Sequence, residues 1–287
     1  MPLMLPDDIS QTVQRALTED IGHGDLTANL IAPEAYAKAQ VITREDAILC
    51  GTAWFDEVFH EVDKRLQITW HATDGEAIRA GQVLCVLEGP ARGLLTGERT
   101  ALNFLQLLCG TATLTQRYVE AIRGTGATIL DTRKTVPGLR RAQKYAVTCG
   151  GGQNHRMGLY DAILIKENHI AAAGSVAAAL QQARNTAPEN TPIEIEVENM
   201  EQLREALAAG ANHLLLDNFT PDKLREAVRE TSGRAKLEAS GGIRLENIRA
   251  IAETGVNFIS VGGLTKDVRA VDLSLRILER SSPAPPY

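Results

Sequence analysis

The sequence has few cysteines and no excess of positive charge, and each shortage excludes a class of protein. Its 287 residues include four cysteines, none of which forms a Cys-x-x-Cys pair. This spacing predicts neither a zinc site nor a disulfide framework. The formal net charge is -6. Nucleic acid and anionic membrane surfaces are therefore excluded as main partners, because both require a dominant positive field.

The sequence also lacks any apolar run long enough for a transmembrane helix, and its first residues lack the basic and then apolar layout of a signal peptide. We therefore expect a soluble, cytoplasmic protein. No lysine lies between Lys64 and Lys134. Residues 74–89 resemble half of a biotinyl or lipoyl carrier domain, but no lysine is present there to carry the cofactor. A carrier module is therefore a weak interpretation.

What the sequence does contain is enough apolar material for a large core, since 44% of its residues are hydrophobic. Residues 8–20 and 94–108 have apolar residues at helical spacing. Between them, β patterns occupy residues 39–43, 66–70 and 83–88, with a helix near 54–62. We expect residues 1–113 to form one N-terminal α/β domain.

Residues 114–267 alternate between strand and helix in steps of roughly 20 to 35 residues, as successive β-α units require. The predicted strands end near Asp131, Lys166, Glu198, Asp217, Ser240 and Gly262. Six such units close most naturally into a barrel, although a doubly wound open sheet has the same local pattern. We expect residues 268–287 to form a helix over about 268–279 that returns to the N-terminal domain, followed by a frayed, Pro-rich tail.

The carboxyl ends of these strands carry most of the polar chemistry. Arg133 and Lys134 follow the first strand, and two adjacent cations repel each other unless an anion lies between them. Later strand ends present Lys166 and Asp217. Ligand sites of parallel α/β folds lie outside these ends. We therefore expect an anionic ligand there.

The strand at residues 193–198 is unusual because three glutamates share one face and apolar residues share the other. Interior carboxylates are too costly unless cations, hydrogen bonds or a metal compensate for them. An edge strand with one wet face is the alternative. If the carboxylates are compensated, cations from other strand ends point into the same cavity. Those cations are Arg133, Lys134 and Lys166.

Small residues follow the last two strands. Ser240-Gly241-Gly242 and Gly262-Gly263 each precede a predicted helix start, where backbone N–H groups suit a phosphate. A further glycine-rich segment, residues 149–152, leads to His155 and Arg156. The chain thus offers more cations than one phosphate needs. They are Arg99, Arg133, Lys134, Arg156 and Lys166. This cationic set suits a ligand with planar carboxylates, which arginine binds through two parallel hydrogen bonds.

Several of these segments in combination resemble the quinolinate phosphoribosyltransferase family. The segments are residues 95–103, 131–135, 150–156, 164–169, 194–198 and 259–265. The resemblance covers about residues 8–280. It implies an N-terminal α/β open sandwich and an incomplete α/β barrel of about six strands. It also implies a homodimer, possibly a hexamer, in which the sandwich of one subunit caps the barrel of the other.

The same resemblance implies an activity in NAD biosynthesis. Quinolinate and phosphoribosyl pyrophosphate react, with Mg²⁺, to give nicotinate mononucleotide, pyrophosphate and CO₂. The residues implied to be catalytic are Lys134, Lys166, Glu196 and Asp217. Those implied to bind quinolinate are Arg133, His155, Arg156 and Lys166, with Arg99 reaching in from the partner subunit. Lys134 is implied to lie between quinolinate and the pyrophosphate. Glu196 and Asp217 are implied to face the ribose and the metal. The 5'-phosphate is implied to bind Ser240, Gly241, Gly242, Gly262 and Gly263.

Two other enzyme classes stay open on the residues alone. The nearer is a phosphoribosyltransferase of the same fold that acts on another ring, as in the molybdenum-operon relative of this family. The second is a barrel lyase or aldolase that uses Lys166 as a Schiff base. Glu196 and Asp217 argue against the second, because carboxylates near a lysine favour its charged form.

Overall fold

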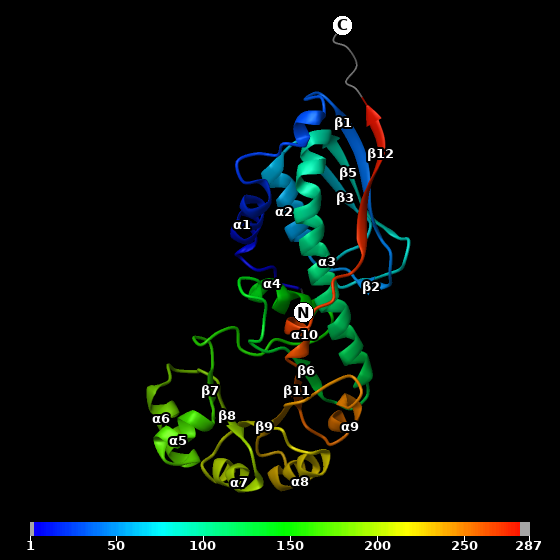
Figure 1. The fold of residues 1–287 in the computed structure, drawn as a ribbon. Helices are drawn as coiled ribbons and strands as arrows, with labels where there is room; N and C mark the ends of the chain where they lie inside the picture. Colours follow the sequence, from blue (N-terminus) through cyan, green and yellow to red (C-terminus); the bar gives the residue numbers. More distant parts are fainter. Residues whose placement is uncertain (1–2, 282–287) are drawn as a thin grey trace. The chain divides into compact units, whose positions relative to one another are not determined.

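The computed structural model describes residues 3–281 and divides into two compact units, each formed from separate stretches of the chain (Figure 1). Of the described residues, the first unit contains 3–116, 136–151 and 267–281. The second contains residues 117–135 and 152–266. No helix among the described residues has the length and apolar character needed to cross a membrane.

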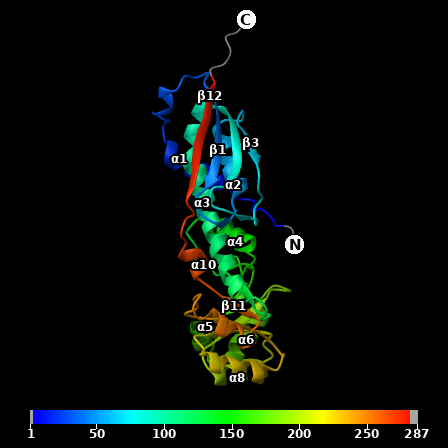
Figure 2. The ribbon, with the colours of Figure 1, turned by 90° about the vertical axis from the view of Figure 1, so that its right-hand side faces the viewer.

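The first unit is built on an antiparallel four-stranded sheet in the order β12-β1-β5-β3. Its strands are β1 (Tyr36–Thr43), β3 (Gln67–Trp70), β5 (Val83–Pro90) and β12 (Leu273–Ser281), and the short strands β2 (Ala47–Ile48) and β4 (Ala77–Ile78) pair separately. Its helical elements are α1 (Ile9–Ile21), η1 (Ala28–Leu30), α2 (Thr52–Val62), the first part of α3 (Ala91–Ala121) and α4 (Arg140–Cys149). Helices α1, α2 and α3 lie on one face of the sheet (Figures 1 and 2).

Alternation along β1 explains this packing. Ala39 and Val41 are fully buried on the face that meets the helices, and α2 contributes the fully buried Trp54 and Phe55. The helices expected at 8–20 and 54–62 and the three expected strands are present. Helix α3 is much longer than the expected 94–108, since it runs for 31 residues.

The expected C-terminal helix at 268–279 is wrong. Residues Leu273–Ser281 form β12, which pairs antiparallel with β1 in a register that places Val41 opposite Leu275. The physical reason lies in the pattern, because Val271, Leu273, Leu275 and Ile277 alternate with polar residues at a period of two. The segment does return to the first unit. The expected frayed tail falls, after Ser281, outside the described residues.

The second unit is a parallel sheet in the order β6-β11-β10-β9-β8-β7. The strands are β6 (Thr128–Leu130), β7 (Ile163–Ile165), β8 (Ile193–Val197), β9 (His213–Asp217), β10 (Lys236–Ser240) and β11 (Phe258–Ser260). Over the described residues β6 and β7 do not pair, so the sheet stays open. The prediction of an incomplete six-stranded α/β barrel is thus confirmed, and a closed barrel is excluded.

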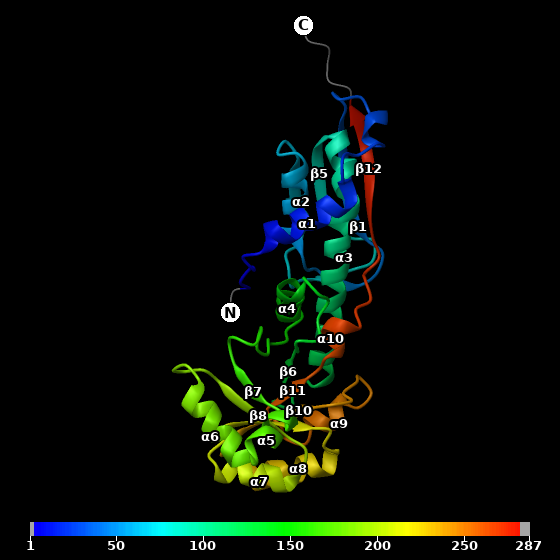
Figure 3. The ribbon, with the colours of Figure 1, turned by 60° about the vertical axis from the view of Figure 1, so that its left-hand side comes forward.

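Helices lie along the outer side of this sheet (Figure 3). They are α5 (Glu167–Ala173), α6 (Val176–Thr186), α7 (Met200–Ala208), α8 (Pro221–Thr231) and α9 (Ile248–Ala252), and the single turn α10 (Gly263–Lys266) follows β11. Helix α5 was not expected from the sequence. Residues that face the helices are apolar and buried, as Ile195, Leu214 and Ala239 show.

The strand register places the polar residues together on the opposite face. Glu238 pairs with both Leu215 and Phe258, and Ser240 pairs with Asp217. Paired residues point to the same side of a sheet, and side chains along one strand alternate between its sides. The polar residues of this inner face are Thr128, Glu194, Glu196, His213, Asp217, Lys236, Glu238, Ser240 and Ser260.

Candidate functional site

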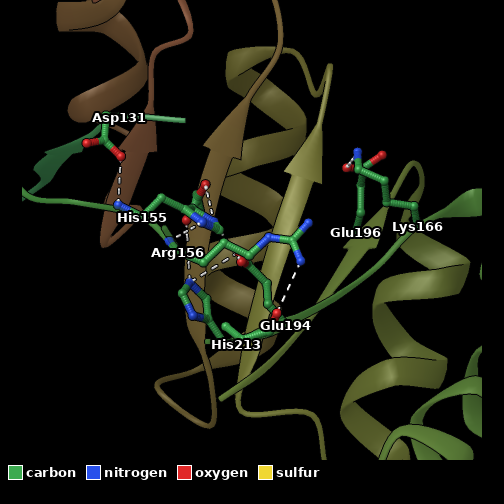
Figure 4. Close-up of polar contacts among 9 residues, drawn as sticks. Asp131, His155, Arg156, Lys166, Glu194, Glu196 and His213 are labelled. Carbon is green, nitrogen blue, oxygen red and sulfur yellow. Dashed lines mark hydrogen bonds and ion pairs between the residues drawn. The ribbon is translucent and has the colours of Figure 1, made fainter. Parts of the chain in front are cut away.

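The carboxyl end of β8 carries an ion pair. The Lys166 Nζ lies 2.6 Å from Glu196 Oε2, and Glu196 is only 8% exposed. Burial raises the pKa of Glu196, the hydrogen bond from Lys166 opposes the shift, and the negative charge of Asp217 adds to it, so the pKa stays above its ordinary value. The two carboxylates are therefore electrostatic neighbours on adjacent strands. Figure 4 shows Lys166 and Glu196 as a pair apart from the other labelled side chains.

A pair of arginines forms the cationic part of the site. Burial lowers the pKa of Arg156, and the positive charge of Arg133 lowers it further. The two guanidinium groups are therefore close enough to repel each other. Arg156 is held by a hydrogen bond of 3.1 Å from Nη1 to the backbone oxygen of Ala162. Two half-buried cations, of which Arg156 is held in place, are suited to an anion with more than one carboxylate.

A buried aspartate fixes the loop that carries Arg156. The Asp131 side chain is fully buried at the end of β6 and accepts hydrogen bonds from Asn154 Nδ2 at 2.6 Å and from the His155 backbone N–H at 2.9 Å. Gln153 also pairs with Leu130 as a parallel bridge. The loop therefore continues the sheet beside β6, and Arg133 and Arg156 come together although 23 positions separate Asp131 from Asn154.

A second polar cluster is buried deeper on the same face. His155 Nε2 lies 2.9 Å from Glu194 Oε2 and 3.7 Å from Glu238 Oε1. His213 Nε2 lies 3.5 Å from Glu194 Oε1 and 3.7 Å from Glu238 Oε2. Glu194 is 5% exposed and Glu238 is fully buried. Figure 4 shows His155, Glu194 and His213 gathered in this cluster.

The two glutamates of this cluster titrate in opposite directions. Burial raises the pKa of Glu194, but the hydrogen bond from His155 and the charges of His213 and His155 outweigh it and leave the pKa lowered. Burial and the negative charge of Glu194 raise the pKa of Glu238 to about 8. Burial likewise lowers the pKa of His213. Glu238 therefore keeps its proton to a higher pH than an ordinary glutamate does.

This titration predicts a pH effect on stability. An acid whose folded pKa is raised binds more protons in the folded state, so the stability that it confers falls as the pH rises from about 4.5 to about 8. Glutamine mimics the protonated acid and cannot ionise. We expect Glu238→Gln to gain melting temperature relative to the parent protein as the pH rises through this window. Thermal denaturation at pH 5.5 and 8.5 measures the effect, and an unchanged difference would contradict it.

Glycines at the strand ends permit close approach. Gly241 has a φ of +95°, and a Cβ there would lie 2.1 Å from Asn218 Oδ1. Asn218 in turn donates to Asp217 Oδ2 at 2.6 Å. A Cβ on Gly262 would lie 3.0 Å from Lys134 Cδ, and Thr265 Oγ1 donates to the Lys134 backbone oxygen at 2.7 Å.

The helices after these glycines are short. Helix α9 begins at Ile248 and has five residues, and α10 is a single turn that precedes residue 268, where a helix was expected to start. Any phosphate held here would therefore depend more on the backbone N–H groups of the loops and less on helix dipoles.

The structure brings most of the expected residues to one end of one sheet. Lys166, Glu196 and Asp217 form one group, and Arg133 with Arg156 forms another. Lys134 and the five residues of the two Gly-rich turns lie at neighbouring strand ends. Arg99 is exposed on α3 in the first unit, so its contribution to a site stays a prediction.

We expected Arg133, Lys134 and Lys166 to compensate the charges of the three glutamates at residues 194–198, and the structure shows this for one glutamate. Lys166 pairs with Glu196, whereas His155 rather than a lysine contacts Glu194, and Glu198 is exposed beyond the end of β8. Sequence reasoning missed the supporting role of four polar residues, of which two are buried and two are not. The buried ones are Asp131 and Glu238, and the others are His213 and Asn218. Glu238 gave no local signal, since it alternates with Leu237 and Ala239 as an exposed strand residue would.

Comparison with known proteins identifies relatives over most of the chain. Residues 25–109 match the model of the quinolinate phosphoribosyl transferase N-terminal domain, and residues 111–276 match the model of the C-terminal domain. A Bacillus subtilis protein named probable nicotinate-nucleotide pyrophosphorylase (carboxylating) is 47% identical over 259 residues, 90% of each chain. A Mycobacterium leprae nicotinate-nucleotide pyrophosphorylase (carboxylating) is 44% identical over 94% of this chain and 97% of its own. The solved structure of the Francisella tularensis nicotinate-nucleotide pyrophosphorylase superposes with a TM-score of 0.93 at 47% identity, covering 96% of this chain and 98% of that one.

Proposed function

The chain belongs to the quinolinate phosphoribosyl transferase family, and we propose that it converts quinolinate and phosphoribosyl pyrophosphate into nicotinate mononucleotide, pyrophosphate and CO₂. It is a phosphoribosyltransferase enzyme of pyridine nucleotide biosynthesis. The function that we considered next, transfer to another ring by the molybdenum-operon relative, is not favoured by these relatives.

The observation that carries the proposal is the separation of charge at the strand ends. The Arg133–Arg156 pair provides two guanidinium groups for a ring with two carboxylates. On neighbouring strands Glu196 and Asp217 provide negative charge for a different group. A dianionic pyridine and a sugar that becomes cationic during reaction need these two environments side by side.

The chemistry follows from this arrangement. The bond from the ribose C1 to the pyrophosphate oxygen breaks, the bond from C1 to the pyridine nitrogen forms, and the sugar develops oxocarbenium character that Glu196 and Asp217 stabilise electrostatically. The ring nitrogen is then cationic. It accepts the electron pair released when the adjacent carboxylate leaves as CO₂, and a proton replaces that carboxylate on the ring. Arg133 and Arg156 orient the ring for both steps.

The carboxylates of Glu196 and Asp217 fit a magnesium ion. Mg²⁺ typically binds proteins through one or two carboxylates together with substrate phosphates. Burial is the main reason why the pKa of Glu196 is raised, and the negative charge of Asp217 raises it further. A cation between the two carboxylates would relieve their repulsion. We propose that these two residues hold Mg²⁺ with the pyrophosphate. When bound, the ion would neutralise the charge of the leaving group.

The proposed function is tested by stoichiometry. Purified protein is incubated with phosphoribosyl pyrophosphate, Mg²⁺ and quinolinate labelled in the 2-carboxylate, and nicotinate mononucleotide, pyrophosphate and released CO₂ are counted. We expect one of each per quinolinate consumed. Nicotinate, which lacks the second carboxylate, serves as the matched control substrate. Nucleotide formation from nicotinate alone, or no consumption of quinolinate, would overturn the proposal.

The metal assignment makes a separate prediction. Chelation with EDTA should abolish product formation, and added Mg²⁺ should restore it. Asp217→Asn should raise the Mg²⁺ concentration needed for half-maximal rate about tenfold, because one ligand charge is lost while its size is kept. Asp222→Asn, an exposed change on α8, is the control. Equal Mg²⁺ dependence of both variants would contradict the assignment.

Two further properties are part of the proposal. The active site is proposed to be shared in a homodimer, possibly within a hexamer, because Arg99 lies outside the unit that holds the other site residues. The enzyme is proposed to act in the cytoplasm. All four cysteines are buried free thiols, which is the state that a reducing compartment maintains.

A further inference from the structure

The polar cluster of His155, Glu194, His213 and Glu238 was given no step in the chemistry described above, although His155 itself stays a predicted quinolinate ligand. Glu194 lies two residues before Glu196 on β8, and Glu238 lies two residues before Ser240 on β10, so the cluster is on the same face of the sheet and farther from the strand ends. Burying two carboxylates beside two partly exposed histidines is costly, and several polar atoms of these four side chains have no hydrogen-bond partner within the described structure. These atoms are Glu194 Oε1, His213 Nε2 and both carboxylate oxygens of Glu238. Such groups call for an explanation.

The hydrogen bonds of His155 define its protonation. The backbone N–H of Arg156 donates to His155 Nδ1 at 2.8 Å, so Nδ1 presents a lone pair. In a neutral imidazole the proton is then on Nε2. That Nε2–H points at Glu194 Oε2, 2.9 Å away. One ring therefore connects a buried carboxylate to the backbone of Arg156.

The same geometry argues against a metal in the cluster. The ligand atoms of His155, Glu194 and Glu238 lie within 4.8 Å of one another, which could suit an ion. A metal on Nε2 would need the lone pair of that nitrogen and would move the proton to Nδ1. Nδ1–H would then face the Arg156 N–H, and the 2.8 Å hydrogen bond would be lost.

Glu194 is itself held by the rest of the cluster. His213 Nε2 faces its other oxygen at 3.5 Å, and Glu238 lies between the two histidines at 3.7 Å from each. The His213 ring also packs against Phe258, with centroids 5.4 Å apart. Side chains from β8, β9, β10 and β11 thus form a support beneath the His155 ring.

We propose that Glu194, Glu238 and His213 are positioning residues that hold His155 with its proton on Nε2, and that His155 thereby sets the position of Arg156. Arg156 is then fixed at two points, its backbone by His155 Nδ1 and its guanidinium by the Ala162 oxygen. The three supporting residues are assigned no contact with substrate. The consequence for binding rests on the proposed function, because it concerns how Arg156 meets the quinolinate carboxylate.

The experiment compares substitutions of one supporting residue. Glu238→Ala removes the support and should raise the quinolinate KM about tenfold, while the KM for phosphoribosyl pyrophosphate and kcat change less than about threefold. Glu238→Gln preserves shape and the neutral form and should restore the quinolinate KM towards that of the parent. Leu237→Ala, on the opposite face of β10, is the control for simple destabilisation and should leave both KM values unchanged.

A spectroscopic readout separates this inference from the function itself. Ring ¹⁵N shifts of His155, assigned with a His155→Gln sample, report which nitrogen carries the proton. We expect Nε2–H in the parent and a mixture of tautomers in Glu238→Ala. If that variant does not fold, Glu194→Gln and His213→Gln take its place, with a mixture expected in at least one. An unchanged tautomer in every variant, or one equivalent of tightly bound metal in the parent, overturns the inference. Failure to consume quinolinate overturns only the proposed function.

Discussion

Replacing Arg156 with alanine is expected to raise the KM for quinolinate about 100-fold, which corresponds to ~3 kcal/mol for a lost charge-assisted hydrogen-bond pair. The guanidinium is half-buried beside Arg133 and is fixed by the Ala162 oxygen, so its orientation is set before the ligand arrives. The KM for phosphoribosyl pyrophosphate should change little, because Glu196 and Asp217 on other strands serve that substrate. Initial rates with each substrate varied in turn measure both constants.

Two matched variants make the Arg156 result specific. Arg156→Lys keeps the charge but loses the planar fork, so we expect an intermediate rise of about tenfold. Arg225→Ala removes an exposed arginine of the same unit that pairs with Asp222 within α8, and it should leave both constants unchanged. A larger rise in the KM for phosphoribosyl pyrophosphate than in that for quinolinate would place Arg156 in the other subsite.

The strand ends were predictable because each one combines two independent signals. A buried apolar run sets the strand, and a polar residue after it is placed at the same edge as its neighbours by parallel topology. Arg133, Lys166 and Asp217 follow from this reasoning alone. The sequence pattern did not predict which of the two units the helix α4 belongs to. Residues 136–151 interrupt the second unit in sequence yet pack with the first, because long-range contacts and not local pattern decide that choice.

The support beneath the site was harder to predict for a related reason. A buried glutamate such as Glu238 reads locally as an exposed strand residue, and only the register reveals that it shares a face with Glu194 and His213. Strand β12, which we expected to be a helix, failed for the opposite reason. Its alternation was visible in the sequence, but its partner β1 lies more than 200 positions away, and strand pairing at that separation has no local signal.

Hybrid dimers should show whether the active site is shared. Lys166→Ala leaves Glu196 without its 2.6 Å partner and should lower kcat about 100- to 1,000-fold. Arg99→Ala should be comparably inactive if Arg99 of the partner subunit binds quinolinate. In a mixed dimer one site receives both defects and the other receives neither. Random exchange makes about half of the dimers mixed, so activity should recover to about one quarter of the parent value.

The recovery is measured by mixing the two inactive proteins, dissociating and reassociating them, and following CO₂ release over time. Mixing Lys166→Ala with Glu196→Gln is the control, because both changes affect the same barrel. In that mixed dimer each site keeps one defect, so recovery should stay near zero. No recovery in the first mixture, with subunit exchange verified by mass, would mean that Arg99 serves no partner's site. Full activity of Arg99→Ala on its own would show that the second unit binds quinolinate without it.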